Sequence, residues 1–217
     1  MESERTDPEQ EKQVAGVAAA DLVEAGMLVG LGTGTTVAYL LSALGRRHLD
    51  ISCVATSPAT ELLARKEGIR VGPFEGIARL DMAIDGADQV DPSGWLIKGG
   101  GGAHTREKIV AAAADQFVVI VSSNKLVSRL LPPVPLELMV FGLDATLRSL
   151  PDVTLRQAPA SPDGGVLADF HGEVDDPTQL AAMFGATAGI VAHGLFPPAM
   201  VSRVLVGRAA KVETLTF

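Results

Sequence analysis

The segment KGGGGAHTREKIV, residues 98–110, places four consecutive glycines between a lysine and a glutamate. Ordering such a run is costly, because glycine loses more backbone freedom on folding than any other residue. The run is therefore either a flexible linker or a place where bare backbone passes close to a small ligand. In the second case, Lys98 could extend into a cleft as a point charge and Glu107 could transfer protons.

Glu107 falls in the first turn of a helix that the sequence predicts over residues 103–114. Acidic residues at this position favour the helix dipole, so a purely structural role is also compatible with it. The dipole would lower the pKa of the carboxyl group, whereas a general base benefits from a raised pKa. Burial or a bound phosphate dianion would have to act in the opposite direction. His104, at the same junction, could contact a substrate, cap the helix or face solvent.

Two carboxylates lie three residues apart in the segment DGAD, at the end of an apolar strand predicted over residues 80–85. Asp85 and Asp88 on a tight turn could bind sugar hydroxyls or transfer protons. The alternative is a solvated aspartate-rich turn, which is common. Gly86 favours a functional role because it lets a neighbour approach closely. A metal site is the weaker interpretation, since the spacing is not that of a calcium loop and no histidine is near.

A third motif, GLGTGTT over residues 30–36, follows a predicted strand and opens a predicted helix. It is not the dinucleotide fingerprint, because Thr35 stands where that pattern requires glycine, and no GK[ST] follows as in a P-loop. Its backbone N–H groups and hydroxyls at a helix start suit a phosphate monoester. An ordinary strand-to-helix turn is an equally good interpretation. Lys125 in SSNK, after a later strand, could meet the same phosphate or be an exposed loop lysine.

The elements that would position these motifs alternate between short apolar strands and helices, which predicts an α/β fold with a mainly parallel, doubly wound sheet. Ligands of such sheets bind at the carboxyl ends of the strands, where all three motifs fall. The segment around Thr6–Glu9 predicts the start of the first helix. The strands are predicted over residues 27–31, 51–56, 69–71, 80–85 and 117–123, and the helices over 36–44 (closed by Gly45), 58–67 and 103–114.

The order of elements changes after LPPVP, residues 131–135. Strands and helices then alternate as β-α-β-β-α-β, the ferredoxin-like order, which predicts a second, smaller α+β domain. Residues 1–130 with 206–217 would form the large α/β domain and residues 131–205 the small one. A last apolar segment, residues 200–207, is expected to return to the large domain. The core of the small domain is expected to contain Phe141, Phe170, Phe184 and Phe196.

Composition limits the classes of partner. The net charge of −8 argues against a nucleic-acid or anionic-membrane surface. The only cysteine, Cys53, lies in an apolar run that predicts a buried thiol. The first residues are polar and lack the apolar stretch of a secretory signal, and no apolar run is long enough to span a bilayer. We therefore expect a soluble cytoplasmic protein whose partner is a small molecule.

Taken together, the motifs resemble those of ribose-5-phosphate isomerases of the A type. The resemblance rests on GLGTGTT, TSPATE (56–61), DGAD, KGGGGAHTREKIV and the SSNK lysine, in that order. It implies interconversion of D-ribose 5-phosphate and D-ribulose 5-phosphate through an enediolate, in the non-oxidative pentose phosphate pathway. It also implies a homodimer or homotetramer that needs no metal or organic cofactor. Gln89 and His104 depart from the usual residues of the family.

The resemblance further implies roles for individual residues. Glu107 would move a proton between the first two carbons, Lys98 would stabilise the enediolate oxygen, and Asp85 and Asp88 would bind hydroxyls and assist ring opening. The phosphate would be held by Thr33, Gly34, Thr35, Thr36 and Lys125. The sugar would lie against Asp85, Gly86, Ala87, Asp88, Lys98, Gly99, Gly100 and Gly101.

Two other functions stay open from the residues alone. One is isomerisation or deamination of another sugar phosphate. The other is a non-catalytic sugar-phosphate sensor, which could keep GTGTT and Lys125 but would need neither Glu107 nor Lys98.

Overall fold

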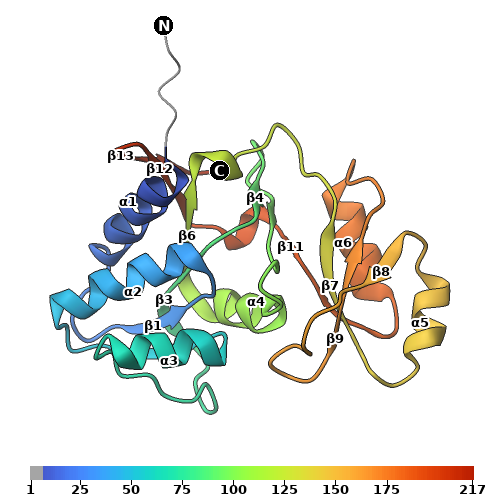
Figure 1. Ribbon diagram of the computed structural model, residues 1–217, viewed down its shortest axis with the longest axis horizontal. Helices are drawn as coiled ribbons and strands as arrows, with labels where there is room; N and C mark the ends of the chain where they lie inside the picture. Colours follow the sequence, from blue (N-terminus) through green and yellow to red (C-terminus); the bar gives the residue numbers. More distant parts are fainter. Residues whose placement is uncertain (1–6) are drawn as a thin grey trace, which may run out of the picture.

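The computed structural model describes residues 7–217 of the chain. The predicted helix-start residue Thr6 and the polar residues before it lie outside this range. Figure 1 shows a larger α/β part and, beside it, a smaller part that carries α5 and α6. Within the described residues, no helix is long and apolar enough to cross a membrane.

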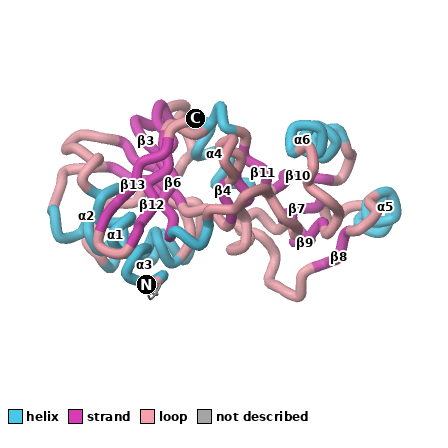
Figure 2. The backbone as a smooth tube through the Cα atoms, turned by 90° about the horizontal axis from the view of Figure 1, so that it is seen from above, coloured by secondary structure: helices cyan, strands magenta, loops and turns pink. Residues whose placement is uncertain are grey.

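A six-stranded sheet forms the centre of the larger part, in the order β13-β12-β6-β3-β1-β2. All neighbouring strands are parallel except β12 and β13, which pair antiparallel. Figure 2 shows β13, β12, β6 and β3 of this sheet from above. Its strands are β1 (Leu28–Leu31), β2 (Ser52–Ala55), β3 (Leu80–Asp85), β6 (Ala114–Ser122), β12 (Arg203–Arg208) and β13 (Lys211–Leu215).

Helices cover both faces of this sheet, as the doubly wound prediction requires. Side chains of α1 (Pro8–Ala20), α2 (Thr35–Arg47) and α3 (Pro58–Lys66) share one core with Met82, Ile84, Val118 and Ile120. On the other face α4 (His104–Ala113) packs on Ala83, Phe117 and Val119. Residues of β3 and β6 alternate between these two cores because successive side chains of a strand point to opposite faces of the sheet. Asp7 caps α1 by accepting a hydrogen bond from Glu9 N.

The strand order places the GLGTGTT and DGAD loops at the same edge of the sheet. The connection from β1 leads through α2 to β2 on one side, whereas β3 leads to β6 on the other. The loops after β1 and β3 therefore diverge, and they leave a crevice at the carboxyl ends of these strands.

The smaller part contains a four-stranded antiparallel sheet in the order β10-β7-β9-β8. Its elements follow the predicted β-α-β-β-α-β order: β7 (Val134–Leu138), α5 (Leu143–Ser149), β8 (Val153–Leu155), β9 (Val166–Phe170), α6 (Pro177–Ala186) and β10 (Ile190–His193). A three-stranded sheet lies between the two parts, with the order β11 (Leu195–Phe196), β5 (Leu96–Ile97) and β4 (Gln89–Val90).

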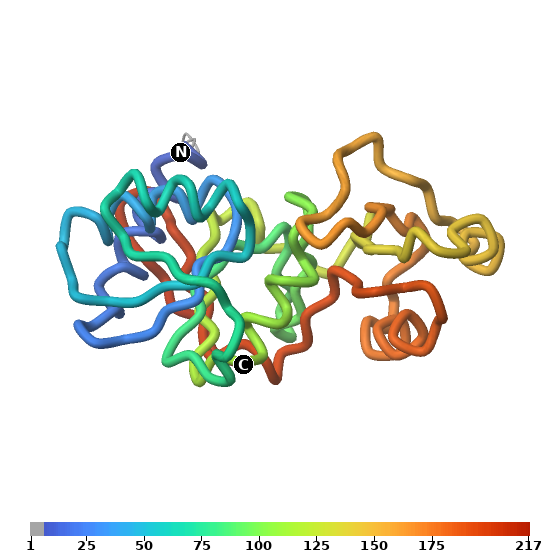
Figure 3. The backbone as a smooth tube through the Cα atoms, turned by 90° about the horizontal axis from the view of Figure 1, so that it is seen from below, coloured from blue at the N-terminus to red at the C-terminus, as the bar shows by residue number. Residues whose placement is uncertain are grey.

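Figure 3 shows the end of the chain, in red, running back into the larger part. There β12 pairs with β6, as we expected of the last apolar segment. The predicted domain boundary at residue 206 falls inside β12. The division into two domains stays a proposal.

Several local predictions were wrong. Gly45 does not end α2, which continues to Arg47. A Cβ at Gly45 would lie 2.7 Å from Glu67 O, so this glycine allows the end of α3 to approach. Residues 69–71 form only an isolated bridge at Val71. The strand β13 was not predicted.

Of the four phenylalanines predicted in the core of the small domain, two lie there. Phe170 and Phe184 are buried in the smaller part, with ring centroids 5.2 Å apart. Phe196 instead belongs to the core under α4, and Phe141 is 88% exposed. Cys53 is buried as expected, and burial raises the pKa of its thiol to about 12.

Candidate active site

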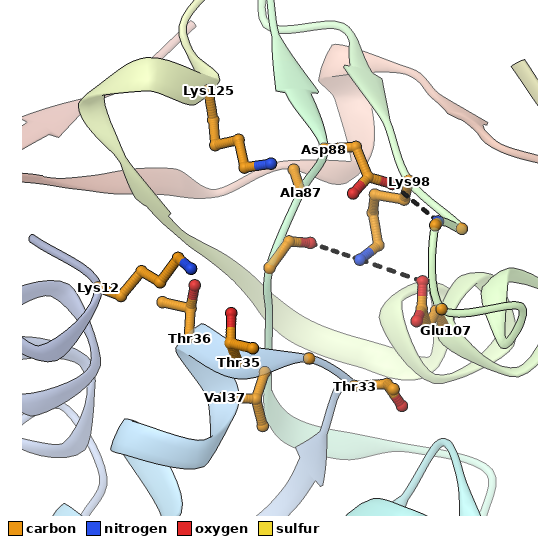
Figure 4. Close-up of a pocket in the computed structure, with 15 residues that line it drawn as sticks. Lys12, Thr33, Thr35, Thr36, Val37, Ala87, Asp88, Lys98, Glu107 and Lys125 are labelled. Atoms are coloured by element: carbon orange, nitrogen blue, oxygen red, sulfur yellow. Dashed lines mark hydrogen bonds and ion pairs between the residues drawn. The ribbon is translucent and has the colours of Figure 1, made fainter. Parts of the chain in front are cut away.

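The three predicted loops line one pocket at the carboxyl ends of β1 and β3 (Figure 4). Every predicted site residue except Asp85 belongs to its lining, which also includes two residues that the sequence did not mark. The lining consists of Lys12, Thr33, Gly34, Thr35, Thr36, Val37, Gly86, Ala87, Asp88, Lys98, Gly99, Gly100, Gly101, Glu107 and Lys125.

Lys98 is the centre of a buried charged cluster. Its ammonium nitrogen lies 2.8 Å from Asp85 Oδ2 and 3.2 Å from Glu107 Oε2. It also donates a hydrogen bond to Gly86 O. All three charged side chains are at most 4% exposed. Lys98 follows β5 and Glu107 lies in the first turn of α4, so the glycine run folds back to bring the two together (Figure 4).

Asp85 lies at the end of β3, beneath the pocket rather than in its wall. Its Oδ1 accepts hydrogen bonds from Thr33 N at 3.0 Å and Gly86 N at 2.7 Å, while Oδ2 faces Lys98. A Cβ at Gly32 would lie 1.9 Å from this carboxylate, so only glycine fits there. Both oxygens of Asp85 thus contact protein groups.

Asp88, in contrast, lies in the pocket wall and accepts a hydrogen bond from Gly100 N at 2.8 Å. In the glycine run next to Asp88, packing against neighbouring residues also requires glycine at two positions. Gly99 has a left-handed φ of +106°, and a Cβ there would lie 2.7 Å from His104 Nδ1. A Cβ at Gly102 would lie 2.5 Å from Leu167. The bare backbone is therefore required by neighbouring protein groups as well as by the pocket.

Burial raises the pKa of Glu107 to about 8, and the negative charge of Asp85 acts in the same direction against the opposing effect of Lys98. The net shift is upward, which is the direction that a general base requires. Burial also raises the pKa of Asp85. For Lys98, burial lowers the pKa, but the two carboxylates outweigh it and the net shift is upward. The cluster thus holds a charged ammonium beside a carboxyl group that titrates near neutral pH.

The other end of the pocket is suited to an anion. No side chain caps the first turn of α2, whose residues Thr35, Thr36 and Val37 line the pocket. Their backbone N–H groups lack intrahelical partners because they belong to the first turn. Lys12 extends from α1 towards Thr36, and Lys125 extends into the pocket from the turn after β6 (Figure 4). Two ammonium groups and a helix start without a side-chain cap suit a phosphate group.

Lys12 was not identified from the sequence, because no motif surrounds it. It follows the acidic first turn of α1 and lies 2.6 Å from Glu9 Oε1, and such pairs usually mark a solvated face. Its neighbour Glu11 is buried and accepts hydrogen bonds from Ser123 N at 2.8 Å and Ser123 Oγ at 2.7 Å. Glu11 thereby connects the helix of Lys12 with the turn of Lys125.

The hydroxyl of Thr33 is directed away from this anion site. It lies 2.8 Å from Thr56 Oγ1 and donates to Ser57 Oγ at 2.9 Å, both in the TSPATE segment. Thr60 Oγ1 donates to Gly32 O at 2.8 Å. The hydroxyl groups of TSPATE therefore hold the glycine-threonine loop in place through hydrogen bonds.

Gln89 and His104, which depart from the usual residues of the family that the motifs resemble, lie outside the pocket lining. His104 is buried behind Gly99, and burial together with the charge of Lys108 lowers its pKa to about 4. The side chain of Gln89 bonds to the backbone N and O of Leu131, each at 2.8 Å. Across residues 7–217, no group of three or more His, Cys, Asp or Glu could hold a metal ion.

Comparisons with known proteins point to one family. The family model for ribose 5-phosphate isomerase A (phosphoriboisomerase A) matches residues 52–211. Ribose-5-phosphate isomerase A of Methanosarcina acetivorans is 44% identical over 202 residues, 86% of each chain. That of Thermosynechococcus vestitus is 42% identical over 86% of this chain and 87% of its own.

Solved structures of ribose 5-phosphate isomerases also superpose on this chain. Ribose 5 phosphate isomerase A from Neisseria gonorrhoeae superposes with a TM-score of 0.92 at 30% identity, covering 97% of this chain and 98% of its own. A D-ribose-5-phosphate isomerase in complex with phospho-erythronic acid gives a TM-score of 0.91 at 33% identity, covering 97% and 100%.

Proposed function

The chain belongs to the ribose 5-phosphate isomerase A family and interconverts D-ribose 5-phosphate and D-ribulose 5-phosphate in the pentose phosphate pathway, and we propose that Glu107 and Lys98 carry out the proton transfer. The observation that supports these roles best is the buried contact of 3.2 Å between Lys98 Nζ and Glu107 Oε2 at the pocket wall.

In the proposed reaction, Glu107 removes the proton from C2 of the open-chain aldose. The C2–H electrons form the C1–C2 double bond, and the aldehyde oxygen becomes the negative oxygen of an enediolate. The ammonium of Lys98 stabilises that charge, and preorganised groups of this kind are commonly worth about 3 to 4 kcal/mol. Glu107 then returns the proton to C1, while a second proton moves from O2 to O1. One carboxylate therefore serves both steps.

We propose different roles for the two aspartates. Asp88 would bind sugar hydroxyls and assist ring opening, and its position in the pocket wall supports this role. Asp85 was expected to do the same, but its oxygens contact Thr33 N, Gly86 N and Lys98. These contacts favour a role in orienting Lys98.

We also propose that this pocket takes a phosphorylated four-carbon acid like the one named with the solved relative, since a planar carboxylate resembles an enediolate. As the resemblance implies, the reaction would need no metal or organic cofactor.

A cytoplasmic homodimer or homotetramer is proposed as well. Its support is an exposed apolar pair, Val140 and Phe141, which are 66% and 88% exposed.

Removing a lysine of the anion site should weaken substrate binding. We expect Lys125→Ala and Lys12→Ala each to raise KM for ribose 5-phosphate about tenfold to a hundredfold, because a hydrogen bond to a charged group contributes roughly 1.5–3 kcal/mol. Steady-state kinetics measure this, with Lys66→Ala on the exposed surface of α3 as the matched control. Wild-type KM in both variants would exclude this end of the pocket as the phosphate site.

The rate should depend on pH through Glu107. Below its raised pKa of about 8 the carboxyl group is protonated and cannot accept a proton, and above it the carboxylate can. We therefore expect kcat/KM to rise with pH and to level off above about pH 8, because kcat/KM reports the pKa of the free enzyme's base. Circular dichroism at each pH verifies folding. A profile that levels off near the ordinary glutamate pKa of 4.5 would contradict the assignment.

A further inference from the structure

The smaller part of the molecule contacts the glycine run through Arg156, which directly follows β8. Its Nη1 donates a hydrogen bond to Gly99 O at 2.8 Å. Its Nε and Nη2 donate to the two oxygens of Asp169 on β9, at 2.7 and 2.6 Å. The side chains of Arg156 and Asp169 are only 16% and 18% exposed. The guanidinium thus joins the small sheet to the backbone beside Lys98.

The glycine run is fixed from both sides. On the pocket side Gly100 N donates to Asp88, and at its start Lys98 N donates to Gly194 O at 2.8 Å. On the outer side Gly99 O accepts from both Gly102 N at 3.0 Å and Arg156. Arg156 is absent from the pocket lining and instead lines a separate hollow with Gly100, Gly101 and Gly102. It therefore holds the run from behind.

We propose that Arg156 is a positioning residue for the isomerase reaction, which fixes the glycine run through Gly99 O and thereby aligns Lys98 with the sugar. The inference rests on the proposed placement of the sugar against residues 98–101. Only arginine offers a planar fork that can bind a carboxylate with two hydrogen bonds and still donate a third. Because glycine loses more backbone freedom on folding than other residues, each contact that orders the run, including this one, offsets part of that cost.

The alternative is that Arg156 and Asp169 only stabilise the small sheet. The two roles differ in what they change. A stabilising pair would affect the melting temperature and leave the kinetics of the folded protein intact. A positioning residue would lower kcat while leaving the distant phosphate contacts in place.

The test compares Arg156→Met and Arg156→Lys with Arg129→Met, which removes an exposed arginine 3.7 Å from Asp175. We expect kcat of Arg156→Met to fall about tenfold to a hundredfold, since a misplacement of about 1 Å can cost a hundredfold. KM and inhibition by inorganic phosphate should change less than about threefold, because the anion site is untouched. Arg156→Lys should recover part of kcat, and Arg129→Met should match the wild type.

Asp169→Asn separates the ion pair from the bond to Gly99, and we expect a smaller loss of kcat than in Arg156→Met. An equal loss would assign the effect to the ion pair and overturn the proposal. So would wild-type kcat in folded Arg156→Met or, if that variant does not fold, in Arg156→Lys. Glu107→Gln, measured alongside, separates this inference from the site itself. If only Glu107→Gln is inactive, Arg156 alone is wrongly assigned, whereas full activity of Glu107→Gln would remove the proposed site.

Discussion

Glu107→Gln is expected to lower kcat on the order of a thousandfold, within the range that loss of a general base typically causes. The amide keeps the shape of the side chain but cannot accept the C2 proton. Because burial already raises the pKa of Glu107, the neutral amide should also leave the protein no less stable than the wild type. Conversion of ribose 5-phosphate to ribulose 5-phosphate at about pH 8 measures the loss of rate.

The matched control is Glu61→Gln on α3, where the carboxylate is 46% exposed and pairs with Arg65. This variant should keep wild-type kcat. We expect inorganic phosphate to inhibit both variants and the wild type to the same extent, since neither change touches the anion site. Full turnover by Glu107→Gln would show that another group is the base.

Lys98→Met should abolish most activity and also destabilise the fold. Loss of the ammonium removes the group proposed to stabilise the enediolate, which typically costs a factor of about a hundred to a thousand. It also leaves Asp85 and Glu107 buried without their shared cation. Breaking a buried ion pair from one side commonly costs about 3–5 kcal/mol of unfolding free energy. Urea unfolding measures this loss of unfolding free energy.

The pH dependence of that loss follows from the two carboxyl groups. Burial raises both of their pKa values, and removing Lys98 raises them further because its positive charge opposes the shift. When the pH falls below these values the carboxyls become neutral, and their burial no longer costs charge desolvation. The destabilisation should therefore be larger at about pH 8 than at about pH 6. Lys66→Met serves as the control, and a destabilisation that grew towards low pH would contradict this account.

The sequence predicted the location of the site because its motifs follow apolar strands. Parallel strands end at the same edge of a sheet, so GTGTT, DGAD and the lysine of SSNK must lie near one another once the strands are assigned. The β-α-β-β-α-β order could be predicted for the same reason, since turn residues separate its short strands and helices.

Other features depend on contacts that no local pattern encodes. Asp85 and Asp88 look equivalent in DGAD, yet one is buried against Lys98 and the other lines the pocket. Lys12 reaches the first turn of α2 because α1 packs against α2 as well as β6 and β12. The bond from Arg156 to Gly99 joins residues 57 positions apart.

The most direct test of the central claim is a crystal structure of the Glu107→Gln variant with ribose 5-phosphate bound. We predict that C1 and C2 lie about 3 Å from the side chain at position 107, the distance that proton transfer requires. The aldehyde oxygen should face Lys98, and the phosphate should lie between Thr35, Thr36 and Lys125. A sugar bound away from residues 98–107, or bound with its phosphate at Lys98, would contradict the account.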